Sequence, residues 1–167
     1  GTAFYKFTTS QQTIDVLMGD IITQLFANNE QGFAFDFNDL STMYQDSAGI
    51  IPVTGTGQPV GRVLDKSGRG NHATQTTSAK RPILQQNAAT GAYYLAFDGV
   101  DDCLVTSNIN FTNQNNLSLF TSVIFNNLSS TSQAIAELST ASWQTQGTFS
   151  LIRGYRGANS YALRRNF

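Results

Sequence analysis

Charged residues are scarce in this chain, and the few that are present nearly balance. Asp, Glu, Lys and Arg make up 13% of the 167 residues, against about 25% in an average soluble domain. The net charge is −1, so the chain has no long-range positive field that would attract phosphates. We therefore expect no nucleic-acid partner and a polar surface built mainly from Ser, Thr, Asn and Gln.

Cysteine and histidine each occur once, as Cys103 and His72. A single cysteine excludes an internal disulfide framework and any metal site built from several cysteines. Cys103 precedes the apolar pair Leu104-Val105, and we expect it to pack as a small hydrophobic side chain. A single histidine excludes a His-based metal cluster. We expect no cofactor, although a Ca²⁺ ion held only by oxygen ligands stays possible.

Long hydrophobic runs are also absent. No stretch approaches the roughly 18 apolar residues of a membrane span, and no signal peptide is evident, so we expect no membrane insertion. The apolar share of 40%, with twelve Phe and six Tyr, is enough for the core of one domain. The chain begins at Gly1 and ends at Phe167 without a closing turn, and we expect these residues to be part of a longer polypeptide, incomplete at the C-terminus.

One amphipathic helix is predicted near the N-terminus. Thr9 and Gln12 have capping-box spacing, and apolar residues then recur at steps of three and four, at Ile14, Leu17, Met18, Ile21, Ile22, Leu25 and Phe26. This pattern predicts a helix from about Thr13 to Ala27, ended by Asn28-Asn29 and Gly32. Two interpretations of its apolar face stay open. It packs either against its own domain or, through an approximate heptad seam, against another copy.

The hydrophobic pattern changes at Gly32 to a period of two. Phe33, Phe35 and Phe37 fall on one side of a predicted strand. We take this change as a domain boundary, with an N-terminal arm and helix at 1–31, used for assembly or packing, and a β-sandwich at 32–167.

The rest of the chain predicts short strands separated by polar turns. Segment Asp39–Gln45 predicts a helical turn, and further strands are expected at Cys103–Thr106, Leu117–Phe125, Ala134–Leu138, Thr148–Arg153 and Ser160–Leu163. Leu117–Phe125 carries apolar residues on both faces, which is typical of an inner strand. The predicted fold class is mainly β, a two-sheet sandwich with a short N-terminal α-helix.

Two turn-rich signatures lie in the stretch Gly57–Asp102. In the first, Gly68 and Gly70 allow positive φ, and Asp65, Ser67 and Asn71 can bind nearby backbone N–H groups. The glycines have neither the spacing of a P-loop nor that of a dinucleotide-binding loop, and no helix pattern follows them. The sequence therefore predicts a structural loop, with His72 as one of its hydrogen-bonded residues and no catalytic residue.

The second signature carries the candidate metal ligands. Asp98, Asp101 and Asp102 place three carboxylates within five residues. Their spacing differs from that of a helix-flanked calcium loop, and Ca²⁺ needs six to eight oxygens. A turn with solvated carboxylates is the leading interpretation, and a Ca²⁺ site is the alternative.

Candidate glycan-binding residues are three aromatic ones near the end of the chain, Trp143, Tyr155 and Tyr161. Their rings could stack on a sugar, although core or rim aromatics are the alternative interpretation. Glycoside hydrolysis needs two carboxylates across a cleft. The chain has only two glutamates, Glu30 and Glu137, and no local motif pairs either with a second carboxylate.

A series of short segments keeps a characteristic order and spacing over roughly Glu30 to Phe125: Phe35–Thr42, Gln45–Gly49, Pro52–Thr54, Gly57–Gly61, Leu64–Gly68, Gly70–Gln75, Arg81-Pro82 and Phe97–Leu104. In these segments the chain resembles bacteriophage and prophage tail or fibre-like virion proteins. This chain departs from the family pattern at Phe35 and Phe37, where Tyr or Trp and Pro are familiar.

The resemblance implies a concanavalin A-like (laminin-G-like) jelly roll on a structural protein of the virion. From it we expect a non-enzymatic component of a tail, fibre or spike, located in the virion and contacting other virion subunits. We also expect a homo-oligomer, a trimer being the commonest fibre arrangement. A carbohydrate-binding receptor module that contacts a host-surface glycan is the alternative, and a polysaccharide depolymerase is a third interpretation.

Overall fold

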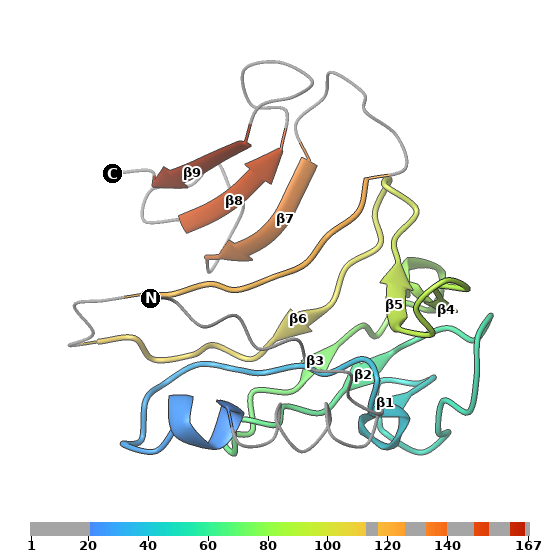
Figure 1. Cartoon of the computed structure of the whole chain (residues 1–167), viewed down its shortest axis with the longest axis horizontal. Coiled ribbons are helices and arrows are strands. Elements are labelled where there is room, and N and C mark those ends of the chain that lie inside the picture. Colours follow the sequence, from blue (N-terminus) through green and yellow to red (C-terminus); the bar gives the residue numbers. More distant parts are fainter. Residues whose placement is uncertain (1–20, 113–116, 126–132, 140–148, 154–160, 166–167) are drawn as a thin grey trace, which may run out of the picture. The chain divides into compact units, whose positions relative to one another are not determined.

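The computed structural model describes residues 21–112, 117–125, 133–139, 149–153 and 161–165. Contacts between Cα atoms divide the chain into two compact units, Gly1–Phe111 and Thr112–Phe167. Both consist mainly of strands in antiparallel sheets, with little helix, as the sequence predicts (Figure 1). The domains predicted from the change of period, 1–31 and 32–167, stay a prediction.

The first unit contains a four-stranded antiparallel sheet. Its strands lie in the order β1 (Met43–Tyr44), β2 (Arg62–Val63), β3 (Ala73–Thr74) and β6 (Val105–Thr106). The register pairs Met43 with Val63 and Val63 with Ala73, so these three side chains share one face, and all three are buried. Their neighbours along the strands are half-buried or exposed. Because side chains alternate along a strand, the sheet has one apolar face and one polar face.

A hairpin contributes to the core of the same unit. Strands β4 (Ile83–Gln86) and β5 (Tyr93–Ala96) pair antiparallel, with Leu84 opposite Leu95. Both leucines belong to a core cluster that also contains Met43 and Val63 of the four-stranded sheet. The whole cluster consists of Met43, Val53, Val60, Val63, Leu84 and Leu95. The hairpin and the sheet therefore enclose one shared hydrophobic core.

Short helical segments connect these strands. The 3₁₀ turn η1 (Leu40–Thr42) confirms the helical turn predicted within Asp39–Gln45, and Asp39 caps it by accepting from the Ser41 N–H. A second 3₁₀ turn, η2 (Ser78–Lys80), precedes β4. No helix among the described residues is long and apolar enough to cross a membrane.

The N-terminal helix is confirmed over residues 21–25, and the predicted part before Ile21 lies outside the described residues. It ends at Leu25, two residues before the predicted end at Ala27. Asn29 and Gly32 then follow with φ values of 62° and 155°, and residues with positive φ are typical after a helix. Ile22 is 8% exposed, whereas Ile21 and Leu25 are 49% and 51% exposed. The apolar face is therefore divided, with one stripe packed inward and another facing outward.

The predicted strand over Phe33–Phe37 is wrong, because the structure assigns this segment no strand. The alternation itself is correct, since the rings of Phe33 and Phe35 stack with centroids 5.1 Å apart. The Lys66 N–H donates to the Ala34 carbonyl, whereas the Ala34 N–H donates to the Asp65 carboxylate. In a β-ladder the Ala34 N–H would donate to a backbone carbonyl of a neighbouring strand, but here the Asp65 side chain accepts this hydrogen bond.

The second unit contains a three-stranded antiparallel sheet in the order β7 (Gln133–Leu138), β8 (Phe149–Arg153) and β9 (Tyr161–Arg165). A register shift between Ala134 and Ala136 marks a bulge in β7. These three strands confirm the three predicted near the end of the chain, with bounds that differ by one or two residues.

The predicted inner strand Leu117–Phe125 is wrong, because no strand is assigned to these residues in the described structure. Phe120 and Ile124 are 82% and 79% exposed. Apolar residues on both faces suit an inner strand only when neighbours flank it and a layer covers each face. No pairing of this kind is assigned in the described residues.

Candidate functional site

The first signature begins with a segment that pairs with β4. The Gly57 N–H donates to the Leu84 carbonyl at 2.8 Å, and the Leu84 N–H donates to the Gln58 carbonyl at 2.9 Å. The Val60 N–H donates to the Pro82 carbonyl at 2.8 Å. Residues 57–60 therefore lie along the hairpin and close one side of the core.

Hydrogen bonds of Arg81 and Gln75 connect the end of the first signature to Cys103. The Arg81 Nε donates to the Gln75 carbonyl at 3.0 Å, and its Nη2 donates to the Thr76 carbonyl at 3.2 Å. The buried Gln75 side chain donates to the Cys103 carbonyl at 3.0 Å and to its Sγ at 3.2 Å. Cys103 is exposed, so the prediction that it packs as a small hydrophobic side chain is wrong. Its carbonyl and sulfur instead accept hydrogen bonds from Gln75.

Asp65 organises the loop of the first signature. Its buried carboxylate accepts four hydrogen bonds, from the Ala34 N–H, the Ser67 N–H and hydroxyl, and the Asn71 N–H, at 2.7–2.9 Å. Burial raises the pKa of Asp65, but the hydrogen bonds from Ser67, Ala34 and Asn71 outweigh this effect and lower it. The carboxylate is therefore ionised and satisfied within its own chain, as the sequence predicts for a structural loop.

His72 belongs to the same loop. Its Nδ1 accepts from the Asp65 N–H at 3.0 Å, so the proton of the neutral ring is on Nε2. The imidazole therefore connects the two ends of the loop. This geometry agrees with the prediction of a hydrogen-bonded loop residue.

Lys66 forms an ion-pair cluster that the sequence analysis missed. Its Nζ lies 2.9 Å from the Asp39 carboxylate and 3.3 Å from that of Asp36. Burial lowers the pKa of Lys66, but Asp39 and Asp36 outweigh that effect and raise it. Both aspartates precede Lys66 by 27 residues or more, so no local spacing indicates the cluster. It ties η1 to the signature loop.

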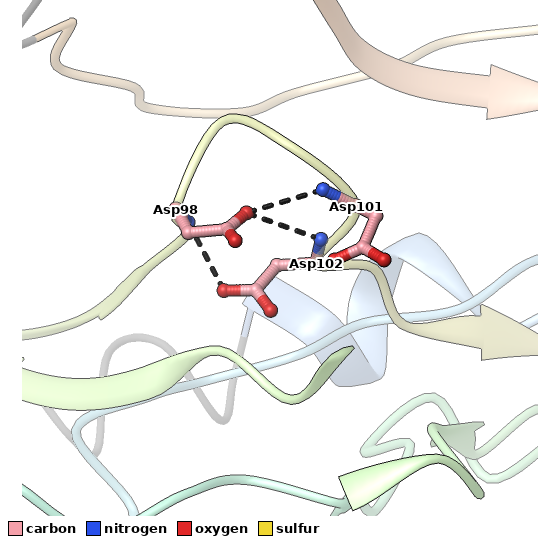
Figure 2. A group of neighbouring side chains, drawn as sticks. All are labelled: Asp98, Asp101 and Asp102. Atoms are coloured by element: carbon pink, nitrogen blue, oxygen red, sulfur yellow. Dashed lines mark hydrogen bonds between the residues drawn. The ribbon is translucent and has the colours of Figure 1, made fainter. Parts of the chain in front are cut away.

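The candidate metal ligands Asp98, Asp101 and Asp102 do lie together, with one carboxylate oxygen of each within 4.8 Å of the others. Figure 2 shows how a tight turn brings them there. The Asp98 Oδ1 accepts from the N–H groups of Val100, Asp101 and Asp102 at 2.8–3.3 Å, and the Asp98 N–H donates to the Asp102 carboxylate at 3.0 Å. The N–H of Val100, followed by those of Asp102 and Asp101, lowers the pKa of Asp98.

These contacts account for the cluster without a metal ion. The turn uses one oxygen each of Asp98 and Asp102, and Lys80 lies 3.2 Å from the Asp101 carboxylate. One oxygen from each of the three carboxylates lies within 4.8 Å of the others, which is fewer than the six to eight oxygens that Ca²⁺ takes, and an ammonium group already lies beside one of the carboxylates. The geometry favours the solvated turn, whereas calcium binding stays the alternative prediction.

The glycan-binding candidates are not brought together by anything that the structure describes. Trp143 and Tyr155 lie outside the described residues, and Tyr161 is described only through its backbone pairing with Arg153 between β9 and β8. In the first unit a shallow polar depression of about 260 Å³ is lined by Thr74, Gln75, Thr76, Val105, Thr106 and Ser107. It is smaller than typical ligand pockets, which measure about 300–1,000 Å³.

Comparison with known proteins identified no relative of this chain. None of the family models, curated proteins or solved structures compared with the chain matches it. The functional interpretation therefore depends on the residues of the chain itself.

Proposed function

We propose that this chain is a structural, non-enzymatic component of a bacteriophage or prophage virion, in a tail, fibre or spike. The observation that supports this proposal is the resemblance carried by the two signatures and the segments around them. Those residues have framework roles in the first unit. Gly57–Val60 pairs with β4, Asp65 organises its loop, and Arg81 links Gln75 and Thr76. Residues that fix a scaffold are expected in a domain that serves assembly.

The proposed fold of this component is a concanavalin A-like (laminin-G-like) jelly roll. Two features support it. The four-stranded sheet has a single apolar face, and the hairpin β4–β5 contributes Leu84 and Leu95 to the same core. Two antiparallel layers around one core are the minimum unit of a sandwich. A jelly roll needs eight strands arranged as two Greek keys, so the finer topology is part of the proposal.

The proposed partners are other virion subunits and further copies of this chain, with a trimer favoured. Ile21 and Leu25 support self-association, because they form an outward apolar stripe on the N-terminal helix. Two heptads are marginal for a coiled coil, so the assembly would need contacts beyond this stripe.

Detection of the polypeptide in purified particles tests the proposal. Virions isolated on a density gradient are digested and analysed by mass spectrometry, and an antibody against the chain is used for gold labelling in electron microscopy. We expect the chain at a fixed stoichiometry in intact particles, with label on the tail or its fibres. Particles from a strain in which the gene is deleted are the matched control. Intact particles that contain no trace of the chain would refute the proposal.

A carbohydrate-binding receptor module is the second candidate. Exposed aromatic side chains favour it, since Tyr94 and Phe97 are 44% and 52% exposed, in addition to the sequence candidates Trp143, Tyr155 and Tyr161. A glycan array probed with the folded protein tests this function. Binding that falls when Trp143 or Tyr155 is replaced by Ala supports it. No binding to any host-surface glycan argues against it.

A further inference from the structure

The loop of the first signature contacts the segment that follows the N-terminal helix. Arg69 donates from Nη2 to the Phe26 carbonyl at 2.8 Å and from Nη1 to the Asn29 side-chain oxygen at 3.0 Å. Asn71 donates from its side chain to the Gly32 carbonyl at 2.6 Å. Two side chains of one loop therefore bind three successive points of residues 26–32.

The contact of Arg69 stabilises the end of the helix in particular. The last carbonyls of a helix have no partner within the helix, and the negative end of the helix dipole favours a cation there. Arg69 supplies both a donor and a positive charge, from a position 43 residues after Phe26. The Arg69 side chain can be removed without changing the hydrophobic core of the sheet, because neither Phe26 nor Asn29, the two residues that it binds, belongs to that core.

The apolar attachment of the same segment is small. Of the described helix residues, Ile22 alone is buried, and Ile21 and Leu25 are about half exposed. Segments with few buried apolar contacts open at lower free energy than the core of a domain. The polar contacts of Arg69 and Asn71 are therefore a large part of what holds the described residues 21–32 in place.

The far end of the segment is anchored differently. The Ala34 N–H donates to the buried Asp65 carboxylate at 2.9 Å, and the Ala34 carbonyl accepts from the Lys66 N–H at 2.8 Å. Between this anchor and the helix lie Asn29 and Gly32, the two residues of the segment with positive φ. Movement about these two residues could displace the helix while Ala34 stays bound.

We propose that Arg69 and Asn71 form a clasp, and that residues 21–32 are a strap that opens as a unit when the clasp is released. Opening exposes Ile22 beside Ile21 and Leu25, so the helix then presents one continuous apolar stripe. The clasp is independent of the proposed virion function. That this stripe then meets a neighbouring subunit rests on the proposed function.

Hydrogen exchange of the full chain, followed by mass spectrometry, tests the clasp. The variants are Arg69→Gln and Asn71→Ala, with Lys80→Gln as the matched control, because Lys80 is also a cation but pairs with Asp101 away from the strap. Hydrogen bonds to a charged group are strong enough that losing those of Arg69 should speed exchange in residues 22–32 by about tenfold or more. Exchange in β2 and β3 should not change, and Asn71→Ala should give a smaller effect in the same residues.

Two outcomes would overturn the proposal. Unchanged exchange in residues 22–32 in both variants would show that Arg69 and Asn71 do not hold the helix. Equal acceleration in residues 22–32 and in β2 and β3 would show that the segment opens only with the whole unit. Neither outcome depends on finding the chain in particles, so failure of the clasp and failure of the virion proposal are distinguishable.

Discussion

Replacing Gly61 with Ala should destabilise the first unit strongly. A Cβ at this position would lie 2.6 Å from the Gln45 carbonyl oxygen, 2.8 Å from the Asp46 carbonyl carbon and 2.9 Å from the Arg81 Nε. Two of these three atoms belong to backbone and cannot rotate away. Gly61 itself is fixed on both sides, since its N–H donates to the Tyr44 carbonyl and its carbonyl accepts from the Gln75 N–H, each at 2.8 Å.

The expected cost follows from these contacts. Forcing one extra carbon into a packed site costs about 1–3 kcal/mol, and each backbone hydrogen bond stretched to relieve the clash costs about 1 kcal/mol more. We therefore expect a loss of about 3 kcal/mol or more in the free energy of unfolding. For a unit of this size that loss corresponds to a fall in Tm of more than about 10 °C.

Urea and thermal unfolding of Gly61→Ala, followed by far-UV circular dichroism, measure this loss. Hydrogen exchange in β1, β2 and β3 assigns the transition to the first unit. Gly55→Ala is the matched control, because a Cβ there meets no atom within 4 Å, and its free energy of unfolding should change by less than about 1 kcal/mol. A Gly61→Ala variant within about 0.5 kcal/mol of the wild type would refute the packing argument.

Two further predictions concern the aspartates. Asp65→Asn should lower the free energy of unfolding by about 1.5–3 kcal/mol at neutral pH, because a charged acceptor of four hydrogen bonds is lost. The folded-state pKa of Asp65 is lowered, so its stabilisation is complete above the pKa of an unfolded aspartate, about 3.9, and is lost as the pH falls through the lower folded value. Urea titrations between pH 5 and 2 should therefore show a shallower loss of stability in Asp65→Asn than in the wild type, and parallel curves would contradict this. At Asp98, where backbone donors satisfy the carboxylate, Asp98→Asn should lower Tm slightly and millimolar Ca²⁺ should leave the wild-type Tm unchanged. A Tm that rises with Ca²⁺ in the wild type but not in Asp98→Asn would instead establish the metal site.

Local sequence chemistry predicted most of the signature loop correctly, although the Asn71 side chain donates to the distant Gly32 carbonyl instead of accepting from a nearby backbone N–H. Gly68 and Gly70 have φ values of 79° and 75°, and the Ser67 and Asn71 N–H groups both donate to Asp65. These features depend on residues two to six positions apart, and such short-range preferences follow from the side chains themselves. The turn at Asp98 was predictable for the same reason.

The partners that complete the loop were not predictable. Ala34 lies 31 residues from Asp65, Phe26 lies 43 residues from Arg69, and Asp36 lies 30 residues from Lys66. Nothing in the local pattern specifies which distant group a carboxylate or guanidinium binds. The same limit explains the failure at Leu117–Phe125, because hydrophobic alternation indicates which faces are apolar but not whether a neighbouring strand is present.

The polar side chains of the first signature bind groups of their own chain, whereas most of those of the second face solvent. This difference determines which signature is accessible to an outside partner. Asp65 and Ser67 are buried, and the side chains of Lys66, Arg69 and Asn71 bind groups of their own chain. A ligand at this loop would have to displace several of these contacts, each costly to break. Asp98 and Asp101 are instead exposed, beside the exposed Phe97 and Val100. Charge or aromatic substitutions at 97–101 should therefore change any interaction of the first unit with an outside partner without unfolding it, whereas substitutions of the buried Asp65 and Ser67 should act through stability.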